Sequence, residues 1–288
     1  MKKLLIIYNP VAGKSIINIK LGEMIEYYTS QGFIVTAMPL FEYLENSKKG
    51  NISAEDYDAA IVTGGDGSVH EAVNGGLTKF GYVPCGSAND IGHSLGISMD
   101  IDQSKISSVK NDFKVIDIGR FNDEIFVYVA AFGLFTEVTY ATPQKIKKDL
   151  GYLAYILQGI KSLADVRGYY MTITTPDGKC CQGEYMVGLI ANSYSIGGFR
   201  SPLSDEVALD DGLFEAVFIR KPNDLIEFNE MMAELVSNPF GGKYVDYIKT
   251  DKAVIECKSD VAWTLDGDFG GSGSRFEIEC IKQALSIR

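Results

Sequence analysis

The stretch that decides the fold is AAIVTGGDGS, residues 59–68, in which a short apolar run leads directly into a glycine-rich turn. The helix-like segment Ser68–Asn74 follows this turn. A short strand, a tight turn and a helix are the repeating step of a parallel α/β sheet. Because open α/β sheets bind their ligands beyond the carboxyl ends of the strands, the turn at Gly64–Ser68 is also the first candidate for a binding site.

The same alternation extends over residues 1–118 and predicts a parallel α/β domain there. Strands are expected at Lys3–Tyr8, Phe33–Met38, Ala59–Thr63 and Phe80–Pro84, and helices at Ile16–Gln31, Ser68–Asn74 and Asn89–Leu95. Three strands end in turns that begin at Asn9, Gly64 and Pro84. We expect these three turns to line one crevice.

After about residue 114 the pattern changes to consecutive strands, which predicts an antiparallel β domain over residues 119–288. The expected strands are Val115–Gly119, Ile125–Ala131, Tyr169–Thr175, Tyr185–Ala191, Leu213–Ile219, Ala253–Cys257, Val261–Leu265 and Phe276–Cys280. Helices are expected at Lys145–Leu163 and Asn223–Val236, and a tight hinge near Lys114–Arg120. A return of the C-terminal residues to the first domain is left open.

The composition excludes several classes of protein. A length of 288 residues favours two domains, and 27 basic against 38 acidic side chains give a net charge of −11. This charge argues against electrostatic binding of nucleic acid or of anionic lipid. The five cysteines are odd in number and lack C-x-x-C spacing, which indicates a reduced, cytosolic setting. The apolar run at the start is cut by Asn9-Pro10, so it is interpreted as a strand and not as a signal peptide.

The turn NPVAGKS, residues 9–15, superficially resembles a phosphate-binding P-loop. That motif requires glycine at position 8, where this chain has Tyr8. The turn can still offer backbone N–H groups to a phosphate, and a plain strand-to-helix turn is the alternative.

The turn Gly64–Ser68 lets backbone amides approach an anion closely, because its glycines have no Cβ. A carboxylate beside a polyphosphate requires a metal ion between them, so Asp66 implies Mg²⁺. A dinucleotide-binding fingerprint is excluded, because His70 stands where its third glycine belongs. The turn Gly86–Asp90 follows the same logic, with Asp90 expected to cap the next helix. For the Gly64–Ser68 turn, the alternative is a tight turn in which Asp66 only caps the helix.

Two further acidic turns lie in the second half, at Asp210-Asp211 and at Asp266-Gly267-Asp268. Each is equally well interpreted as a solvated turn. The two histidines, His70 and His93, are too few for a three-histidine zinc site and are expected to be structural. The expected helix Lys145–Leu163 carries lysines beside an apolar face. This pattern suits either a membrane contact or a helix that packs against the protein with its lysines in solvent.

Taken together, these motifs resemble the diacylglycerol kinase catalytic-domain family, which includes bacterial lipid kinases and the sphingosine and ceramide kinases. The resemblance runs almost end to end and rests on an ordered set of motifs. They are Asn9-Pro10-x-x-Gly13-Lys14, Gly64-Gly65-Asp66-Gly67-Ser68-x-x-Glu71-x-x-Asn74-Gly75, Pro84-x-Gly86-Ser87-x-Asn89-Asp90, Gly197-Gly198, Asp210-Asp211-Gly212 and Asp266-Gly267-Asp268. The first glycine-rich motif alone also occurs in NAD kinases and 6-phosphofructokinases.

The resemblance implies an N-terminal Rossmann-like α/β domain, an antiparallel β-sandwich domain and an active site in the cleft between them. The residues that it implies for ATP are Asn9, Pro10, Gly13, Lys14, Gly64, Gly65, Asp66, Gly67, Ser68, Glu71, Gly86, Ser87, Asn89 and Asp90. It also implies a bound Mg²⁺ at Asp211 and the main-chain carbonyls of Ala208 and Leu213, tied through water to Asp66 and Asp90.

The general base of the family, a Glu, falls on Asp268. Its side chain is one methylene shorter, and a misplacement of about 1 Å can cost on the order of 100-fold in rate. Two milder departures are Ser68 and Ser87 in place of Thr, and the segment Asp205–Leu209 in place of Pro-x-Ala-x-Leu.

We therefore expect an ATP- and Mg²⁺-dependent kinase that phosphorylates a lipid hydroxyl, with diacylglycerol or a related bacterial lipid as the acceptor. We expect it in the cytoplasm, transiently at the inner membrane face, without a nucleic acid partner; a homodimer is left open. Two other functions stay open. One is an NAD kinase-like enzyme with a soluble acceptor, and the other is a nucleotide-binding regulator that has lost catalysis.

Overall fold

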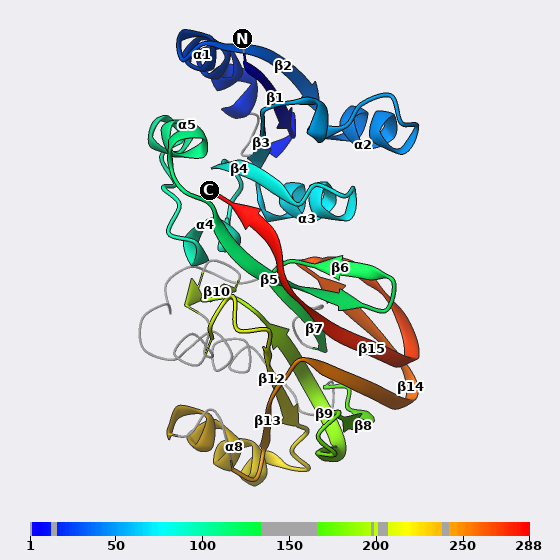
Figure 1. Ribbon diagram of the computed structural model, residues 1–288. Coiled ribbons are helices and arrows are strands. Elements are labelled where there is room, and N and C mark those ends of the chain that lie inside the picture. The colour runs from blue at the N-terminus through cyan, green and yellow to red at the C-terminus, as the bar shows by residue number, and fades with distance from the viewer. Residues whose placement is uncertain (1, 13–15, 134–165, 197–198, 201–206, 238–241) are drawn as a thin grey trace. The chain divides into compact units, whose positions relative to one another are not determined.

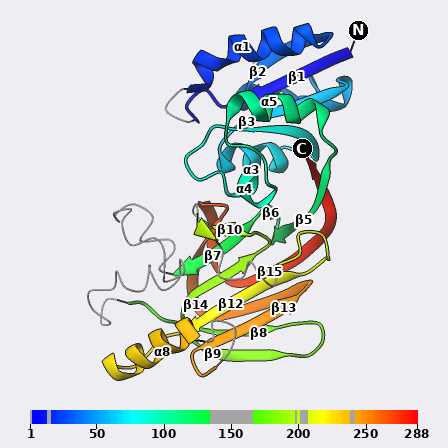
Figure 2. The ribbon, with the colours of Figure 1, turned by 90° about the vertical axis from the view of Figure 1, so that its left-hand side faces the viewer.

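The computed structural model describes residues 2–12, 16–133, 166–196, 199–200, 207–237 and 242–288. The chain divides into two compact units (Figures 1 and 2). Unit 1 comprises Met1–Ile116 together with Gln283–Arg288, and unit 2 comprises Asp117–Lys282. The expected helix Lys145–Leu163 and the residues Gly13, Lys14, Gly197 and Gly198 lie outside the described residues.

Unit 1 is built on a parallel sheet with the strand order β2-β1-β3-β4. The strands are β1 (Lys2–Tyr8), β2 (Phe33–Pro39), β3 (Ala59–Gly64) and β4 (Lys79–Pro84). The end of the chain adds a further parallel strand, because Ser286 and Ile287 pair with Lys79 and Phe80 of β4. Parallel pairing of this part of the chain is the arrangement that the sequence predicts.

Helices lie on both faces of this sheet. They are α1 (Ile16–Ser30), α2 (Leu40–Lys48), α3 (Asp66–Asn74), α4 (Asp90–Ser94) and α5 (Ile101–Lys110), with a 3-10 turn η2 (Ala54–Asp56). In Figure 1, α1 and α5 lie on one side of the sheet, and α2 and α3 on the other. Cover on both faces explains why Leu4–Ile7 of β1 form a continuous apolar run with no exposed surface. The sequence analysis did not predict α2 and α5.

Unit 2 consists mainly of antiparallel strands with the order β13-β12-β9-β7-β14-β15. The strands are β5 (Lys114–Phe121), β6 (Glu124–Phe126), β7 (Val129–Gly133), β8 (Tyr169–Thr174), β9 (Cys180–Ala191), β10 (Ser195–Ile196), β11 (Phe199–Arg200), β12 (Phe214–Arg220), β13 (Val245–Thr250), β14 (Lys252–Leu265) and β15 (Asp268–Ile287). One helix of this unit, α8 (Leu225–Ser237), is described. The sandwich packing of these strands and the cleft between the domains stay predictions.

Three sequence predictions in unit 2 are wrong in detail. Ile125–Ala131 is not one strand but two, β6 and β7, with a break at Val127-Tyr128. The expected strands Ala253–Cys257 and Val261–Leu265 are one strand, β14, whose register against β15 shifts in the middle. The strand β13 was not predicted, because its fully buried apolar residues, Val245 and Ile248, do not alternate.

The core of unit 2 is centred on Trp263, the single tryptophan of the chain, which has no exposed surface. Its ring lies 5.0 Å from that of Phe121, 4.8 Å from that of Phe132 and 5.6 Å from that of Phe276, measured between centroids. Tilted aromatic pairs at these distances add to the free energy gained by burial. The core therefore fixes β14 against its neighbours and, with it, the turn at Asp266–Asp268.

None of the helices that the structure describes combines the length and the apolar character that crossing a membrane requires.

Candidate functional site

The first and second predicted turns meet at Asn9, directly after β1. The Asn9 N–H donates to the carbonyl oxygen of Thr63 at 3.0 Å, and the Asn9 Nδ2 donates to the Ser68 Oγ at 3.0 Å. The Asn9 Oδ1 accepts the N–H of Val11 at 3.1 Å and shapes its own turn. Asn9 therefore joins the end of β1 to the end of β3 and the start of α3.

The second and third turns are in direct contact through two glycines. A Cβ on Gly86 would lie 2.4 Å from the Gly65 Cα, and a Cβ on Gly65 would lie 3.0 Å from the Gly86 Cα. The residues that precede these glycines are also bonded, because the Cys85 N–H donates to the carbonyl oxygen of Gly64 at 2.9 Å. Glycine is needed here because the two backbones approach more closely than any side chain allows.

Asn89 gives the third turn its shape. Its backbone is left-handed, with φ of 53°, which asparagine tolerates better than most residues. Its Oδ1 accepts the Gly86 N–H at 2.9 Å, and its Nδ2 donates to the carbonyl oxygen of Gly86 at 3.0 Å. Asn89 is also the N-cap residue of α4, so the prediction that Asp90 caps this helix is wrong. Asp90 is instead the first helical residue and has no exposed surface.

Asp66 links the second turn to the third through α4. It is the first residue of α3, is 8% exposed, and its Oδ1 accepts the N–H of Ile91 at 3.1 Å. The hydroxyl of Tyr82 lies beneath both turns and donates to the carbonyl oxygen of Gly64 at 3.2 Å. Burial raises the pKa of Tyr82, and the charges of Asp66 and Asp90 raise it further, so the hydroxyl stays protonated. The sequence analysis missed Tyr82.

The structure thus brings Asn9, Asp66 and Asn89 together at the carboxyl ends of β1, β3 and β4. Ser68 is buried, while Glu71 and Ser87 are exposed. Pro10 and Gly67 are half-buried. These residues of unit 1 form a cradle of backbone amides and small side chains around one carboxylate.

In unit 2, the predicted base, Asp268, is the first residue of β15 and follows a turn that Asp266 stabilises. The carboxylate of Asp266 accepts three backbone N–H groups, from Val127 at 2.6 Å, Tyr128 at 2.9 Å and Val129 at 3.0 Å. Asp266 is 4% exposed and has a left-handed backbone, with φ of 52°. These bonds divert the amides of Val127 and Tyr128 from strand pairing, which is why β6 and β7 are separate. Asp268, two residues later, is exposed.

The other acidic turn of unit 2 is neutralised by a lysine. The Asp211 Oδ1 accepts the Leu213 N–H at 3.0 Å, and the Asp211 Oδ2 lies 3.0 Å from the Lys249 Nζ. The same ammonium lies 2.8 Å from the Glu215 Oε1, and the Glu215 side chain has no exposed surface. Burial raises the pKa of Glu215. Burial alone would lower the pKa of Lys249, but the two carboxylates raise it more.

The main chain of this turn is held by Asp117 of β5 and by Asn192. The Leu209 carbonyl accepts the Asp117 N–H at 2.7 Å and the Asn192 Nδ2 at 3.2 Å. The Gly212 N–H donates to the Asp117 Oδ2 at 2.6 Å. The sequence analysis missed Asp117 and Asn192, because neither belongs to a motif near the turn in the sequence.

The arrangement does not fit a divalent ion at Asp211. Mg²⁺ requires about six oxygen ligands in octahedral geometry. Both carboxylate oxygens of Asp211 are already engaged, one by an N–H and one by an ammonium. Among the described residues, no group of three acidic, histidine or cysteine side chains could hold a metal ion. The assignment of Asp211, Ala208 and Leu213 to Mg²⁺ therefore stays a prediction without support from their geometry.

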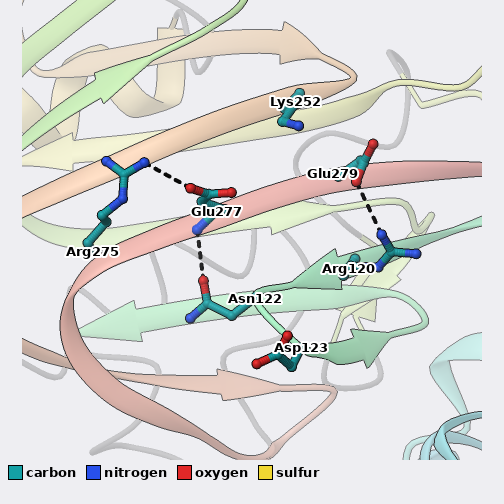
Figure 3. A pocket seen from close by; sticks show the side chains of 7 residues that line it. All are labelled: Arg120, Asn122, Asp123, Lys252, Arg275, Glu277 and Glu279. Carbon is teal, nitrogen blue, oxygen red and sulfur yellow. Dashed lines mark hydrogen bonds and ion pairs between the residues drawn. The ribbon is translucent and has the colours of Figure 1, made fainter.

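A separate hollow of about 570 Å³ in unit 2 is lined by charged side chains (Figure 3). Its residues are Arg120, Asn122, Asp123, Lys252, Arg275, Glu277 and Glu279. Arg275 pairs with Glu277 at 2.8 Å, and Arg120 with Glu279 at 3.4 Å. Because these arginines are already neutralised by glutamates, the hollow is a poor site for an anion.

Comparison with known proteins identifies the family. The model of the diacylglycerol kinase catalytic domain matches residues 3–121. A protein of Bacillus subtilis (strain 168) named diacylglycerol kinase is 31% identical in an alignment of length 279 that covers 94% of this chain and 91% of the relative. The chain belongs to the diacylglycerol kinase family. This diacylglycerol kinase family member is therefore a phosphotransferase with an alcohol group as acceptor, and its family implies ATP as the phosphoryl donor.

Solved structures show the same fold. A proposed diacylglycerol kinase from Bacillus anthracis str. Sterne has a TM-score of 0.78 at 23% identity, and the match covers 99% of this chain and 94% of the other. An NAD kinase from Archaeoglobus fulgidus in complex with ATP has a TM-score of 0.50 at 10% identity, covering 99% of this chain and 92% of the other. The fold of this family member is thus shared with kinases of two kinds.

Proposed function

We propose that this member of the diacylglycerol kinase family transfers the γ-phosphoryl group of ATP, with Mg²⁺, to the hydroxyl of diacylglycerol or a related lipid. The observation that carries the proposal is the convergence of three turns in unit 1. Asn9 is bonded to Ser68, Gly65 touches Gly86, and Asp66 is bonded to Ile91. Phosphoryl transfer depends mostly on positioning and on neutralising charge, which such a cradle can provide.

The cradle fits a triphosphate with its cation. The turn Gly64–Ser68 leads into the N-terminus of α3, where backbone N–H groups and the helix dipole favour an anion. Gly65 and Gly86 let the second and third turns pack against each other, which brings their backbone amides close together. Asp66 supplies a carboxylate, the kind of ligand that Mg²⁺ prefers. When bound, Mg²⁺ would neutralise charge on the phosphates, and Asp66 would orient it.

We assign to Asp268 the role of the general base, which takes up the proton of the acceptor hydroxyl. As the lipid oxygen bonds to the γ-phosphorus, the bond from phosphorus to the leaving ADP oxygen breaks, and the hydroxyl proton passes to the Asp268 carboxylate. The side chain is exposed, as a base for a bulky acceptor must be. Asp266 holds the turn by three hydrogen bonds, which limits the positions that Asp268 can take.

The direct test offers the purified protein radiolabelled ATP, Mg²⁺ and mixed micelles that contain diacylglycerol, a sphingoid base or another glycerolipid. A labelled phospholipid from the diacylglycerol arm supports the proposal. Transfer to none of the lipids contradicts it. A parallel arm with NAD tests the second candidate, which the shared fold with an NAD kinase motivates. NADP formation without lipid transfer would favour that enzyme, and ATP binding without any turnover would favour a regulator.

Two substitutions sharpen this test. Asp66→Asn keeps an oxygen that can accept the Ile91 N–H but removes the charge, so we expect transfer to fall by at least about 100-fold. Asp58→Asn is the matched control, because the Asp58 carboxylate also accepts a backbone N–H, that of Lys3 at 2.7 Å. We expect the control to retain its rate.

For Asp268→Asn we expect a loss of similar size, since the amide cannot take up the proton. Asp260→Asn, which changes another exposed carboxylate of unit 2, is its control. Full activity in Asp268→Asn removes Asp268 from the role of base.

We further propose that the enzyme works in the cytoplasm and meets its lipid transiently at the inner membrane face. The apolar residues Leu225 and Ile226 at the start of α8 are 68% and 71% exposed and suit a shallow contact with lipid. Sedimentation with zwitterionic vesicles, compared between the parent and Leu225→Ser/Ile226→Ser, tests this contact. Equal binding of both chains would exclude α8 from it.

A further inference from the structure

The acidic turn of unit 2 contains a cation that belongs to the chain itself. Glu215 of β12 and Lys249 of β13 are directly opposite each other in the antiparallel pair. The Lys249 ammonium lies between two carboxylates, 2.8 Å from the Glu215 Oε1 and 3.0 Å from the Asp211 Oδ2. We call Asp211, Glu215 and Lys249 the lysine cluster.

Glu215 makes this lysine difficult to displace. Its side chain has no exposed surface, so its charge must be balanced from within the protein. A divalent ion bound to the outer Asp211 would repel the ammonium. If the ammonium left, the buried Glu215 carboxylate would lose the cation beside it, and breaking a buried pair in this way is strongly destabilising.

Other groups around the cluster point to the same conclusion. A second lysine, Lys282, donates to the main-chain oxygen of Asp211 at 3.1 Å. The nearby Asp117 carboxylate accepts the Gly212 N–H. The thiol of Cys280 faces Asp117 and Asp211, and burial with these charges raises its pKa to about 12, so it remains neutral. Two lysines, Lys249 and Lys282, thus contact this turn from within the protein.

We propose that the Lys249 ammonium takes the place of a divalent cation at the Asp211 turn, so that unit 2 folds and keeps this turn without metal. The inference rests on the contacts within unit 2 and not on the proposed function. It leaves the Mg²⁺ that accompanies ATP in unit 1 unaffected.

The test measures the thermal unfolding of the full chain by the fluorescence of Trp263, which reports on unit 2. Nucleotide and lipid are left out, and MgCl₂ is compared with NaCl at equal ionic strength. We expect the same midpoint for the parent chain in both salts. For Lys249→Met we expect a midpoint lower by about 5 °C or more, because two carboxylates lose their cation. We expect MgCl₂ to restore part of this loss, since the vacated space now attracts a divalent ion.

Two controls keep the result interpretable. Lys179→Met removes an exposed pair, with Asp177 at 3.4 Å, and should change neither the midpoint nor the response to MgCl₂. If Lys249→Met does not fold, the double variant Glu215→Met/Lys249→Met removes the buried pair as a whole and should fold. Since Asp211 then lacks its lysine, MgCl₂ should raise the midpoint of this variant as well.

The proposal is overturned by either of two results. In the first, MgCl₂ raises the unfolding midpoint of the parent chain. The same rise is absent in Asp211→Asn but present in Asp66→Asn. The other is a midpoint of the lysine-free variants that MgCl₂ leaves unchanged. Because no substrate is present, neither result bears on whether the enzyme phosphorylates a lipid.

Discussion

The two units hold their acidic turns in different ways. In unit 1, the turns are fixed by short backbone contacts and small residues, of which Gly65 against Gly86 is the closest. In unit 2, the turns are fixed by charged side chains: Asp266 accepts three backbone N–H groups, and Lys249 pairs with Asp211 and the buried Glu215. The first arrangement leaves amides for a ligand, while the second uses its charges to hold the protein together. A carboxylate in an acidic turn can thus serve either purpose, and its partners decide which.

The largest effect is expected at Asp266, where a charged side chain fixes a turn of unit 2. Asp266→Ala leaves the N–H groups of Val127, Tyr128 and Val129 without their acceptor in a buried position. At roughly 1–3 kcal/mol for each of the three unsatisfied groups, we expect unit 2 to lose about 3–9 kcal/mol of unfolding free energy. Urea unfolding followed by Trp263 fluorescence measures this loss.

Asp266→Asn is the informative partner of that variant, because its amide keeps one acceptor oxygen. We expect it to lose a smaller amount than Asp266→Ala. A stability of Asp266→Ala equal to that of the parent would mean that water replaces the carboxylate, and that charge does not hold this turn.

The backbone contact of unit 1 is tested by Gly86→Ala. Its Cβ would lie 2.4 Å from the Gly65 Cα, so the two turns must move apart. Overpacking of this kind costs about 1–3 kcal/mol and should also weaken ATP binding. Far-UV circular dichroism during thermal unfolding and a calorimetric ATP titration measure the two effects.

Gly22→Ala is the matched control for this change, because a Cβ on Gly22 in α1 meets nothing within 4 Å. In a helix interior this substitution should stabilise the chain by about 0.5–1 kcal/mol. If Gly86→Ala behaves like Gly22→Ala, the close approach of the turns is not needed.

A further prediction concerns Cys280, a cysteine beside the lysine cluster, and does not involve stability. Burial, with the charges of Asp117 and Asp211, raises the pKa of Cys280 to about 12, whereas Cys180 is exposed. Because the thiolate is the reactive form, we expect Cys280 to react with a maleimide at pH 8 at least about 100-fold more slowly than Cys180. As pH rises towards 12, the rate at Cys280 should keep increasing.

Mass spectrometry of labelled peptides distinguishes the two cysteines. Removing one negative charge by Asp211→Asn should accelerate Cys280 slightly, since burial is the larger cause of the shift. Equal rates at Cys180 and Cys280 in the parent would show that neither burial nor the charges of this turn suppress the thiolate of Cys280.

The meeting of the three turns in unit 1 could be predicted from the sequence, whereas the partners of the acidic turns in unit 2 could not, for a physical reason. A strand followed by glycines and a helix is a local pattern, and parallel strands bring their carboxyl ends to one edge. The turns at Asn9, Gly64 and Gly86 could therefore be placed together without the structure. The helix α5 was missed because IDQSKISSVK carries few apolar residues, and α2 because LFEYLENSK is only nine residues long and follows β2 without a linker.

In unit 2, the decisive partners come from distant parts of the chain. Asp266 interrupts the predicted strand Ile125–Ala131 from a position 139 residues after Val127. Lys249 reaches Asp211 only because β12 and β13 pair in the register that places it opposite Glu215. No local pattern contains such pairings, so the sequence could suggest the acidic turns but not what neutralises them.

The most direct test of the account is hydrogen exchange of the full chain with and without ATP and Mg²⁺. If the three turns of unit 1 hold the triphosphate, ATP will slow the exchange of amides in residues 64–68 and 86–90, and Asp66→Asn will reduce this protection. Amides around the lysine cluster, in residues 209–215, will exchange at the same rate with MgCl₂ alone as without it. Protection by ATP that leaves both glycine-rich turns unchanged would contradict the account.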